Sequence, residues 1–281
     1  MPYAPPRRLT ITGYLTCVAI AAMLIGRTAP GTLAAARTGV ATEATDDSDS
    51  VSPTAIDPAA VSAVSRMSAY LNSLVHYTVH VESTTDQVRL VGPAVQMSAV
   101  AEVSVRRPNA LRVVVRGDDV DQQLVYDGAT IALSAARANV YAVDRAPATL
   151  DTFMDVLERD YGLSLPVSDL LYRARLRPLL RFVTAGVVVG RSWVGDAECD
   201  HLAFHQRDID WQLWIQRGDR PLPRKLVVTT LGEDGAPQHT AVMTWNVEPR
   251  EDDGVFEFVA PPGAERRTVA AVNHASTHPF R

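Results

Sequence analysis

Cysteine is nearly absent from this chain, and its two cysteines are not expected to form a disulfide in the folded protein. Cys17 lies in an apolar run near the N-terminus, so Cys199 is the only cysteine of the expected domain. Glu198 and Asp200 flank Cys199, and their negative charge should raise the pKa of its thiol and lower its reactivity. The domain must therefore hold together by its apolar core.

An excess of basic residues is missing as well. The chain has 27 Lys and Arg residues against 32 Asp and Glu, for a formal net charge of -5 and a pI near 5.8. Nucleic-acid-binding domains usually carry a basic face, so this balance argues against a nucleic-acid partner. Hydrophobic residues make up 47% of the chain and charged residues 21%, which allows a sizeable core and excludes wholesale disorder.

Signatures of catalysis and of metal binding are also lacking. Ser192, in "VGRSWVG", falls within a strand-like run and not on the sharp strand-to-helix turn that presents a nucleophilic serine. Two histidine pairs have the four-residue spacing of a helical metal site: His76 with His80, and His201 with His205. Both pairs lie in strand-like sequence, where four residues span about 13 Å, too far for one zinc ion. We therefore expect no catalytic residue, no metal and no cofactor, and predict that the protein is not an enzyme.

The first 36 residues have the layout of an export signal. Arg7 and Arg8 precede an uncharged apolar run over 9–26, and a later "AAA" triplet offers a cleavage site. The apolar run is also about long enough to span a bilayer, so residues 1–36 are predicted to be a signal peptide or an N-terminal anchor. Residues 37–56 are small, polar and acidic and are predicted to be a disordered linker. The protein is thus expected in the periplasm, either released or anchored to the inner membrane.

The domain is predicted to begin with a helix and to continue with many strands. Asp57-Pro58 is a helix N-cap followed by proline at the first helical position, and an apolar stripe continues to Leu74. Two further helical stretches are predicted at 149–162 and 165–183. Short apolar runs separated by turn-forming residues predict antiparallel strands at 77–84, 97–105, 111–117, 123–128, 130–136, 139–143, 185–194, 199–205, within the hairpin 208–230, and at 239–247 and 255–259.

The predicted fold class is α+β. We expect a large curled antiparallel sheet of roughly eleven strands, forming a half-open β-barrel, because a sheet this wide should curl. The N-terminal helix and the mid-chain helical insertion would cover its concave face as a lid. The domain is predicted to span residues 57–262 and to be followed by a flexible tail over residues 263–281.

The hairpin 208–230 has the most informative pattern. Alternation over 209–216 places one apolar set on one face of a strand and Trp214 on the opposite face. The first set should face the concave side, together with side chains of the inserted helices. The predicted ligand-lining residues are Ile209, Trp211, Leu213, Ile215, Phe153, Leu157, Leu170 and Leu171. The predicted contact for a partner protein is Trp214 with the basic hairpin tip: Trp214, Arg217, Arg220, Arg224 and Lys225. For Trp193 and Trp245, core packing and the lining of a cavity both remain open.

Several short segments occur in the order of a known family. They are "RPNALR" (107–112), "YDG" (126–128), "VYA" (140–142), "LPVSDLLY" (165–172), "CDHLAF" (199–204), "DWQLWI" (210–215) and "PLPRKLVVTT" (221–230). Together they resemble an uncharacterised family of predicted periplasmic proteins. That family looks related to the LolA and LolB lipoprotein carriers, so the resemblance implies a half-open barrel whose apolar concave face receives acyl chains. No catalytic residues come with it.

Two functions remain open from the sequence. The first is an exported, non-catalytic protein that carries or senses a lipid or another hydrophobic ligand in the concave face. The second is an interaction or sensor module for an envelope protein, with a filled core and no ligand. Membrane contact is expected through the N-terminal segment if that segment is uncleaved.

Overall fold

The computed structural model describes residues 56–87, 95–163, 165, 180–233, 235–250 and 252–276. Three α-helices lie in these ranges: α1 (Pro58–Ser73), α2 (Leu150–Tyr161) and α4 (Val269–Ser276), with a short 3-10 helix, η2 (Asp253–Phe256). The strands are β1 (His76–Gln87), β2 (Val95–Arg106), β3 (Ala110–Gly117), β4 (Asp121–Tyr126), β5 (Thr130–Ala135), β6 (Val140–Arg145), β7 (Ala185–Val194), β8 (Ala197–His205), β9 (Ile209–Gln216), β10 (Pro223–Thr230), β11 (Gln238–Asn246) and β12 (Glu265–Arg266). The predicted export signal, the linker up to residue 55 and most of the helical stretch predicted at 165–183 lie outside the described residues.

Helix α1 begins where the sequence predicts. The carboxylate of Asp57 accepts a hydrogen bond from the backbone N–H of Ala59 at 2.8 Å, and Pro58 follows at the first helical position, where no backbone donor is needed. The helix ends at Ser73. Its buried face consists of Ala60, Ala63, Val64, Met67, Ser68 and Leu71. The predicted apolar stripe is therefore the face that packs on the sheet.

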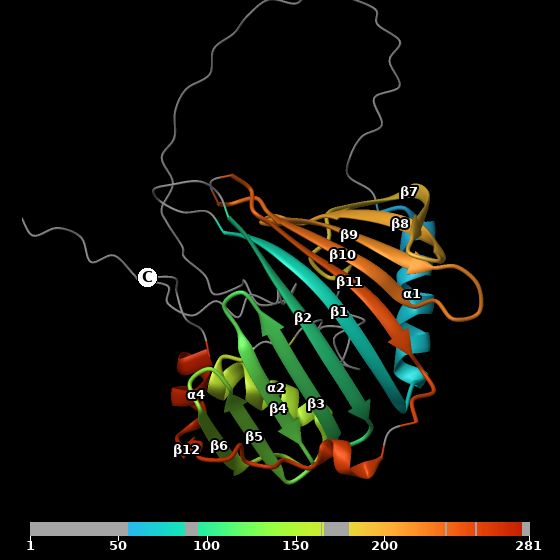
Figure 1. Ribbon diagram of the computed structural model, residues 1–281. Helices are drawn as coiled ribbons and strands as arrows, with labels where there is room; N and C mark the ends of the chain where they lie inside the picture. The colour runs from blue at the N-terminus through green and yellow to red at the C-terminus, as the bar shows by residue number, and fades with distance from the viewer. Residues whose placement is uncertain are drawn as a thin grey trace, which may run out of the picture.

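All twelve strands belong to one open sheet, in the order β12-β6-β5-β4-β3-β2-β1-β11-β10-β9-β8-β7. Strands β1 to β6 form one antiparallel meander, β7 to β11 form another, and β1 pairs with β11 between them. The two-residue β12 runs parallel to β6. Figure 1 shows that this wide sheet curls instead of lying flat. The predicted α+β fold with a large curled antiparallel sheet is confirmed, with twelve strands in place of the expected eleven or so.

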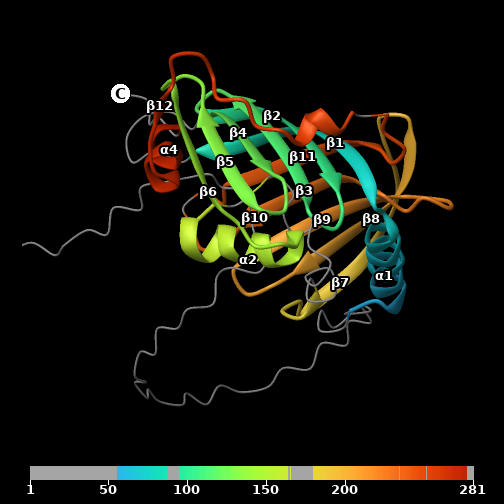
Figure 2. The same cartoon turned by 90° about the horizontal axis from the view of Figure 1, so that it is seen from below.

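Helices α1 and α2 cover different parts of the concave side of the sheet (Figure 2). Helix α1 packs on β7 and β9. Helix α2 lies by β3 to β6, where the ring of Phe153 stacks on that of Tyr126 with centroids 4.0 Å apart. Thr149 caps the start of α2, and Gly162, with a φ of 61°, ends it in the left-handed conformation that glycine adopts readily. The mid-chain helical insertion is thus present at α2.

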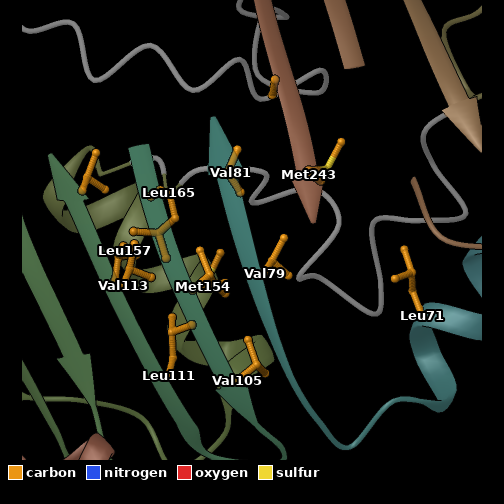
Figure 3. Packing of buried hydrophobic residues seen from close by; sticks show 14 of the residues in the cluster. Leu71, Val79, Val81, Val105, Leu111, Val113, Met154, Leu157, Leu165 and Met243 are labelled. Atoms are coloured by element: carbon orange, nitrogen blue, oxygen red, sulfur yellow. The ribbon is translucent and has the colours of Figure 1, made fainter. Parts of the chain in front are cut away.

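One apolar cluster connects both helices to the sheet. It takes alternate residues from strands β1 to β6 and β8 to β11, because successive side chains of a strand point to opposite faces. Figure 3 shows part of this cluster, with side chains from α1, α2, β1, β2, β3 and β11. Its strand residues include Tyr77, Val79, Val81, Val103, Val105, Leu111, Val113, Leu124, Ile131, Leu133, Leu202, Phe204, Trp211, Leu213, Ile215, Val228 and Met243.

The strand predicted at 255–259 is wrong. Residues up to Phe256 form η2, and those that follow make no ladder. The alternating aromatic rings pack on other side chains instead. Phe256 lies 4.7 Å from the guanidinium carbon of Arg106, and Phe258 lies 5.9 Å from the ring of Tyr141. The alternating pattern over 255–259 thus arises because Phe256 and Phe258 each pack on another side chain, and not because the segment pairs as a strand.

The flexible tail predicted over 263–281 is also wrong for residues 265–276. Glu265–Arg266 pairs with β6, and the following helix α4 buries Val269 and Val272 in the main cluster. The ordered domain therefore extends to Ser276 and does not stop at residue 262. Alanine and two valines give α4 too weak an apolar stripe to predict from sequence. Residues 277–281 lie outside the described part.

Candidate functional site

The concave face carries most of the residues that the sequence predicted to line a ligand. Trp211, Leu213 and Ile215 are all buried in the main cluster, and Ile209 is partly buried against it. Phe153 and Leu157 of α2 belong to the same cluster. Leu170 and Leu171 lie outside the described residues. The predicted face of β9 is therefore confirmed, whereas contact with a ligand remains a prediction.

The expectation that inserted helices lie over Trp211 concerns in large part residues 166–179, which lie outside the described residues. The described helix that packs on β9 is α1, whereas α2 stacks on β4, which lies on the same face but far from β9 in the strand order. The indole of Trp211 also stacks on Phe204 of β8, with ring centroids 4.1 Å apart and an interplanar angle of 22°. Trp211 is 1% exposed, so this aromatic pair lies deep beneath the surface.

The indole N–H of Trp211 is buried and has no hydrogen-bond partner within the described part of the chain. The side-chain nitrogen of Gln206, directly after β8, is likewise buried and without a partner there. Buried tryptophan N–H groups normally find an acceptor, since an unsatisfied buried donor costs about 1–3 kcal/mol. Among the described residues, both donors therefore lack the acceptor that buried N–H groups normally have.

One end of the concave face is polar. Thr85 of β1 and His239 of β11 share a hydrogen bond of 2.7 Å between the hydroxyl and the ring Nδ1. The hydroxyl of Ser83 donates to the carbonyl of Ala99 nearby on β2. His239 is buried, and this burial lowers the pKa of its imidazole, which favours the neutral ring. The concave face thus combines an apolar middle with a polar, uncharged end.

Trp214 does not offer the exposed partner surface that was predicted. Only 8% of it is exposed, because it packs in a small cluster on the opposite face of the sheet with Ala197, Cys199 and Val227. Its ring stacks on His201 at 4.0 Å, and the ammonium of Lys225 lies 4.7 Å from the ring centroid. Both faces of the indole are therefore used within the chain.

The arginines of the predicted contact are also engaged within the chain. Arg217 contacts Glu198 and Asp200 on β8. Arg220 lies 3.1 Å from Glu248, and Arg224 lies 2.8 Å from Asp196. These ion pairs offset the positive charge of the hairpin tip, so the tip is a weaker site for an acidic partner than its sequence suggested.

For Trp193, core packing and the lining of a cavity were both open from the sequence, and the structure gives it neither a buried nor a half-buried place. It lies on β7 and is 69% exposed, whereas Trp211 and Trp214 are buried. Alternation within β7 resembles that of the inner strands, so it gives no sign of this exposure. The missing information is the place of β7 at the end of the sheet order, which depends on the pairing of distant strands.

The histidines that were weighed as metal ligands have partners in the chain. His80 hydrogen-bonds to Glu102, which raises the pKa of its imidazole, and His201 hydrogen-bonds to Gln212 at 3.0 Å. Within the described ranges, no three His, Cys, Asp or Glu side chains gather as a metal site. No helix among the same residues has the length and apolar character needed to cross a membrane.

Comparison with known proteins finds a family match along most of the chain. A family model of predicted periplasmic proteins (DUF2092) matches residues 60–269. No curated protein matches.

Comparison with solved structures finds matches at low identity and low TM-score. An uncharacterised conserved protein from Thermus thermophilus is 10% identical, with 75% of this chain and 99% of that chain covered and a TM-score of 0.42. LprF from Mycobacterium bovis is 13% identical, with 74% and 99% covered and a TM-score of 0.43. A LolA superfamily protein from Nitrosomonas europaea is 10% identical, with 71% and 97% covered and a TM-score of 0.33. Likeness at this level carries over neither a ligand nor an activity.

Proposed function

The chain belongs to the family of predicted periplasmic proteins (DUF2092), and on that premise we propose that it is an exported, non-catalytic protein that binds a lipid or another long apolar ligand. The ligand would lie between the concave face of the sheet and the helices that cover it. Its acyl part would contact the apolar middle of this face, and a polar group would accept a hydrogen bond from Trp211.

The observation that carries this proposal is the buried N–H of Trp211, which has no hydrogen-bond partner among the residues that the structure describes. The indole is held in place by Phe204 and by the main cluster, so its donor cannot turn towards water. An ester or carboxylate oxygen of a lipid would satisfy the donor and remove the cost of leaving it unpaired. Leu213 and Ile215 follow on the same face and offer apolar contact for a chain attached to that oxygen.

Trp211→Phe tests the proposal with little change in packing. Phenylalanine keeps an aromatic ring against Phe204 and removes only the N–H and part of the ring area. Protein would be purified from its own envelope, and bound lipid would be measured by native mass spectrometry and by solvent extraction. We expect lipid on the wild type and clearly less on Trp211→Phe.

Trp214→Phe is the matched control, because it makes the same change three residues away on the opposite face of β9. It should keep the wild-type amount of lipid. A folded wild type that carries no lipid would contradict the proposal and favour an interaction or sensor module with a filled core. Equal lipid on wild type and Trp211→Phe would exclude the indole as the donor.

We also propose that residues 1–36 export the protein and are either removed or kept as an anchor in the inner membrane. The basic start and the apolar run over 9–26 support this. The intact mass of the protein recovered from the envelope distinguishes the two forms. A full-length mass in the soluble cytoplasmic fraction would contradict export.

A further inference from the structure

Strand β7 exposes apolar side chains on both of its faces at one end of the sheet. The most exposed are Val187 (52%), Val189 (55%) and Trp193 (69%), and Val188 and Phe182 are also exposed. No further strand lies beyond β7 in the sheet order of the described residues. Contiguous exposed apolar groups of this kind usually mark a surface that meets a protein or a membrane.

The backbone of β7 is poorly suited to pairing with a strand of another chain. Ile56 already forms a parallel bridge to Gly186 near the start of the strand. The register then shifts between Val188 and Gly190, so Val189 has no partner on β8 and forms a bulge. Bulges and blocked ends protect sheet edges against strand addition. A partner at this edge would therefore contact the side chains of β7 and not its backbone.

The charges around this edge favour an anionic partner. Residues 180–195 contain two arginines, Arg181 and Arg191, and no acidic residue. Both arginines are exposed. The acidic side chains next to Arg191 on β8 are Glu198 and Asp200, and both contact Arg217, whose single positive charge offsets one of their two negative charges. The segment 180–195 is thus apolar, aromatic and positively charged within a chain whose net charge is -5.

We propose that β7 and the residues just before it dock this domain on an anionic lipid surface. Tryptophan suits the boundary between headgroups and acyl chains, and valines beside it add apolar contact. Arginines at the same depth gain from the negative potential of anionic headgroups. The chain also enters the fold beside this strand, since Ile56 bridges Gly186. In the register with β8, Trp193 lies on the same face of the sheet as Leu202, and Val187 lies on the opposite face, so the proposed surface is the end of the sheet at β7 and not the ligand site proposed at Trp211 on β9.

The docking surface can be tested on residues 56–281 alone, without the N-terminal apolar run. All residues of the main cluster lie between Ala60 and Val272, so this part contains its whole described core, and circular dichroism beside the full chain would first show that it is folded. Its binding would be measured by flotation with vesicles of phosphatidylcholine and with vesicles of phosphatidylcholine mixed with phosphatidylglycerol. Vesicles with brominated acyl chains would in addition quench the fluorescence of a tryptophan that reaches them.

Wild type should float with the mixed vesicles, and the brominated chains should quench part of its fluorescence. Arg181→Gln combined with Arg191→Gln should weaken flotation roughly tenfold, and added salt should act in the same direction. Trp193→Phe should abolish the quenching, because the other tryptophans are far less exposed. Val100→Ser, which changes an exposed apolar residue on the outer face of β2, is the matched control and should bind like wild type.

Flotation that is absent, or that is equal in wild type and the double arginine variant, would overturn the proposal. So would quenching that persists in Trp193→Phe. The alternative is that a second copy of the chain occupies this surface, and light scattering after size-exclusion chromatography would detect such a dimer. A dimer that Trp193→Ser dissociates, without vesicle binding by the wild type, would assign β7 to self-association and reject the lipid surface. Neither result depends on whether lipid is recovered from the concave face.

Discussion

Replacing Trp211 with alanine should destabilise the protein far more than the same replacement of Trp214. Trp211 is 1% exposed, stacks on Phe204 and belongs to the cluster that joins the sheet to its helices. Truncating a tryptophan in such a site removes its contacts and leaves a cavity, which costs about 3–5 kcal/mol. Removal of the unpartnered N–H offsets about 1 kcal/mol of this cost. The expected net loss is still a large fraction of the stability of a typical domain.

Trp214→Ala should lower the stability less, because the apolar cluster around Trp214 is smaller and lies nearer to water. It packs with Ala197, Cys199 and Val227 and lies under the ammonium of Lys225. Water can fill part of the space that Trp214→Ala leaves, so the loss consists of the apolar contacts and a cation–π interaction of about 0.5–1 kcal/mol. We expect a total of about 2 kcal/mol.

Urea titrations followed by circular dichroism would measure both losses. The comparison requires lipid-free protein, because a ligand bound only to the folded wild type would add to its apparent stability. It also requires equal m-values, which show that the two variants unfold from equally ordered states. A Trp214→Ala variant that is as unstable as Trp211→Ala, or less stable, would refute the assignment of the two faces of β9.

Three further predictions concern other parts of the fold. Burial lowers the pKa of His239 below its ordinary value of 6.5, so the unfolded chain takes up this proton first and stability should fall as the pH drops below 6.5. His239→Gln should flatten that part of the plot of urea midpoint against pH. The difference between the wild-type and His239→Gln curves isolates the effect of His239, because both proteins keep His80, whose pKa is raised by its hydrogen bond to Glu102. Burial also raises the pKa of the Cys199 thiol, so a thiol reagent should label it only when urea unfolds the domain. Val272→Asp should cost about 3 kcal/mol by placing a charge in the core, whereas Val259→Asp, on a largely exposed residue, should leave the urea midpoint nearly unchanged.

Features with a local signal were predictable from the sequence. The start of α1 depends on Asp57 and Pro58, which are neighbours in the chain, and the structure confirms it. The opposite faces of Trp211 and Trp214 depend on the two-residue period of a strand, and both side chains lie as predicted. The periodicity of α2 from Leu150 to Tyr161 is equally local. Helix and strand periods need no knowledge of the rest of the molecule.

Features that depend on distant pairing were not predictable. Trp193 alternates with its neighbours like a core residue, and it is exposed only because β7 ends the sheet order. Val272 is buried only because β6 and β5 provide a site for α4. The arginines of the hairpin tip lost their predicted role for the same reason: Arg220, for example, meets Glu248 from another part of the chain. Partners far apart in sequence leave no local pattern.

The pairing of β1 with β11 has a consequence for the order in which the protein folds. Its register places Val81 opposite Met243, and the ring of Trp245 lies 5.7 Å from that of Tyr77. Each meander can grow from hairpins with short loops, but this central seam closes a loop of about 160 residues, and the entropy of that closure must be overcome at once. The seam should therefore form last. During synthesis the N-terminus emerges first, so the edge of β1 stays unpaired until β11 has been made. The risk that this edge pairs with a wrong strand should therefore be greatest between the synthesis of β1 and that of β11.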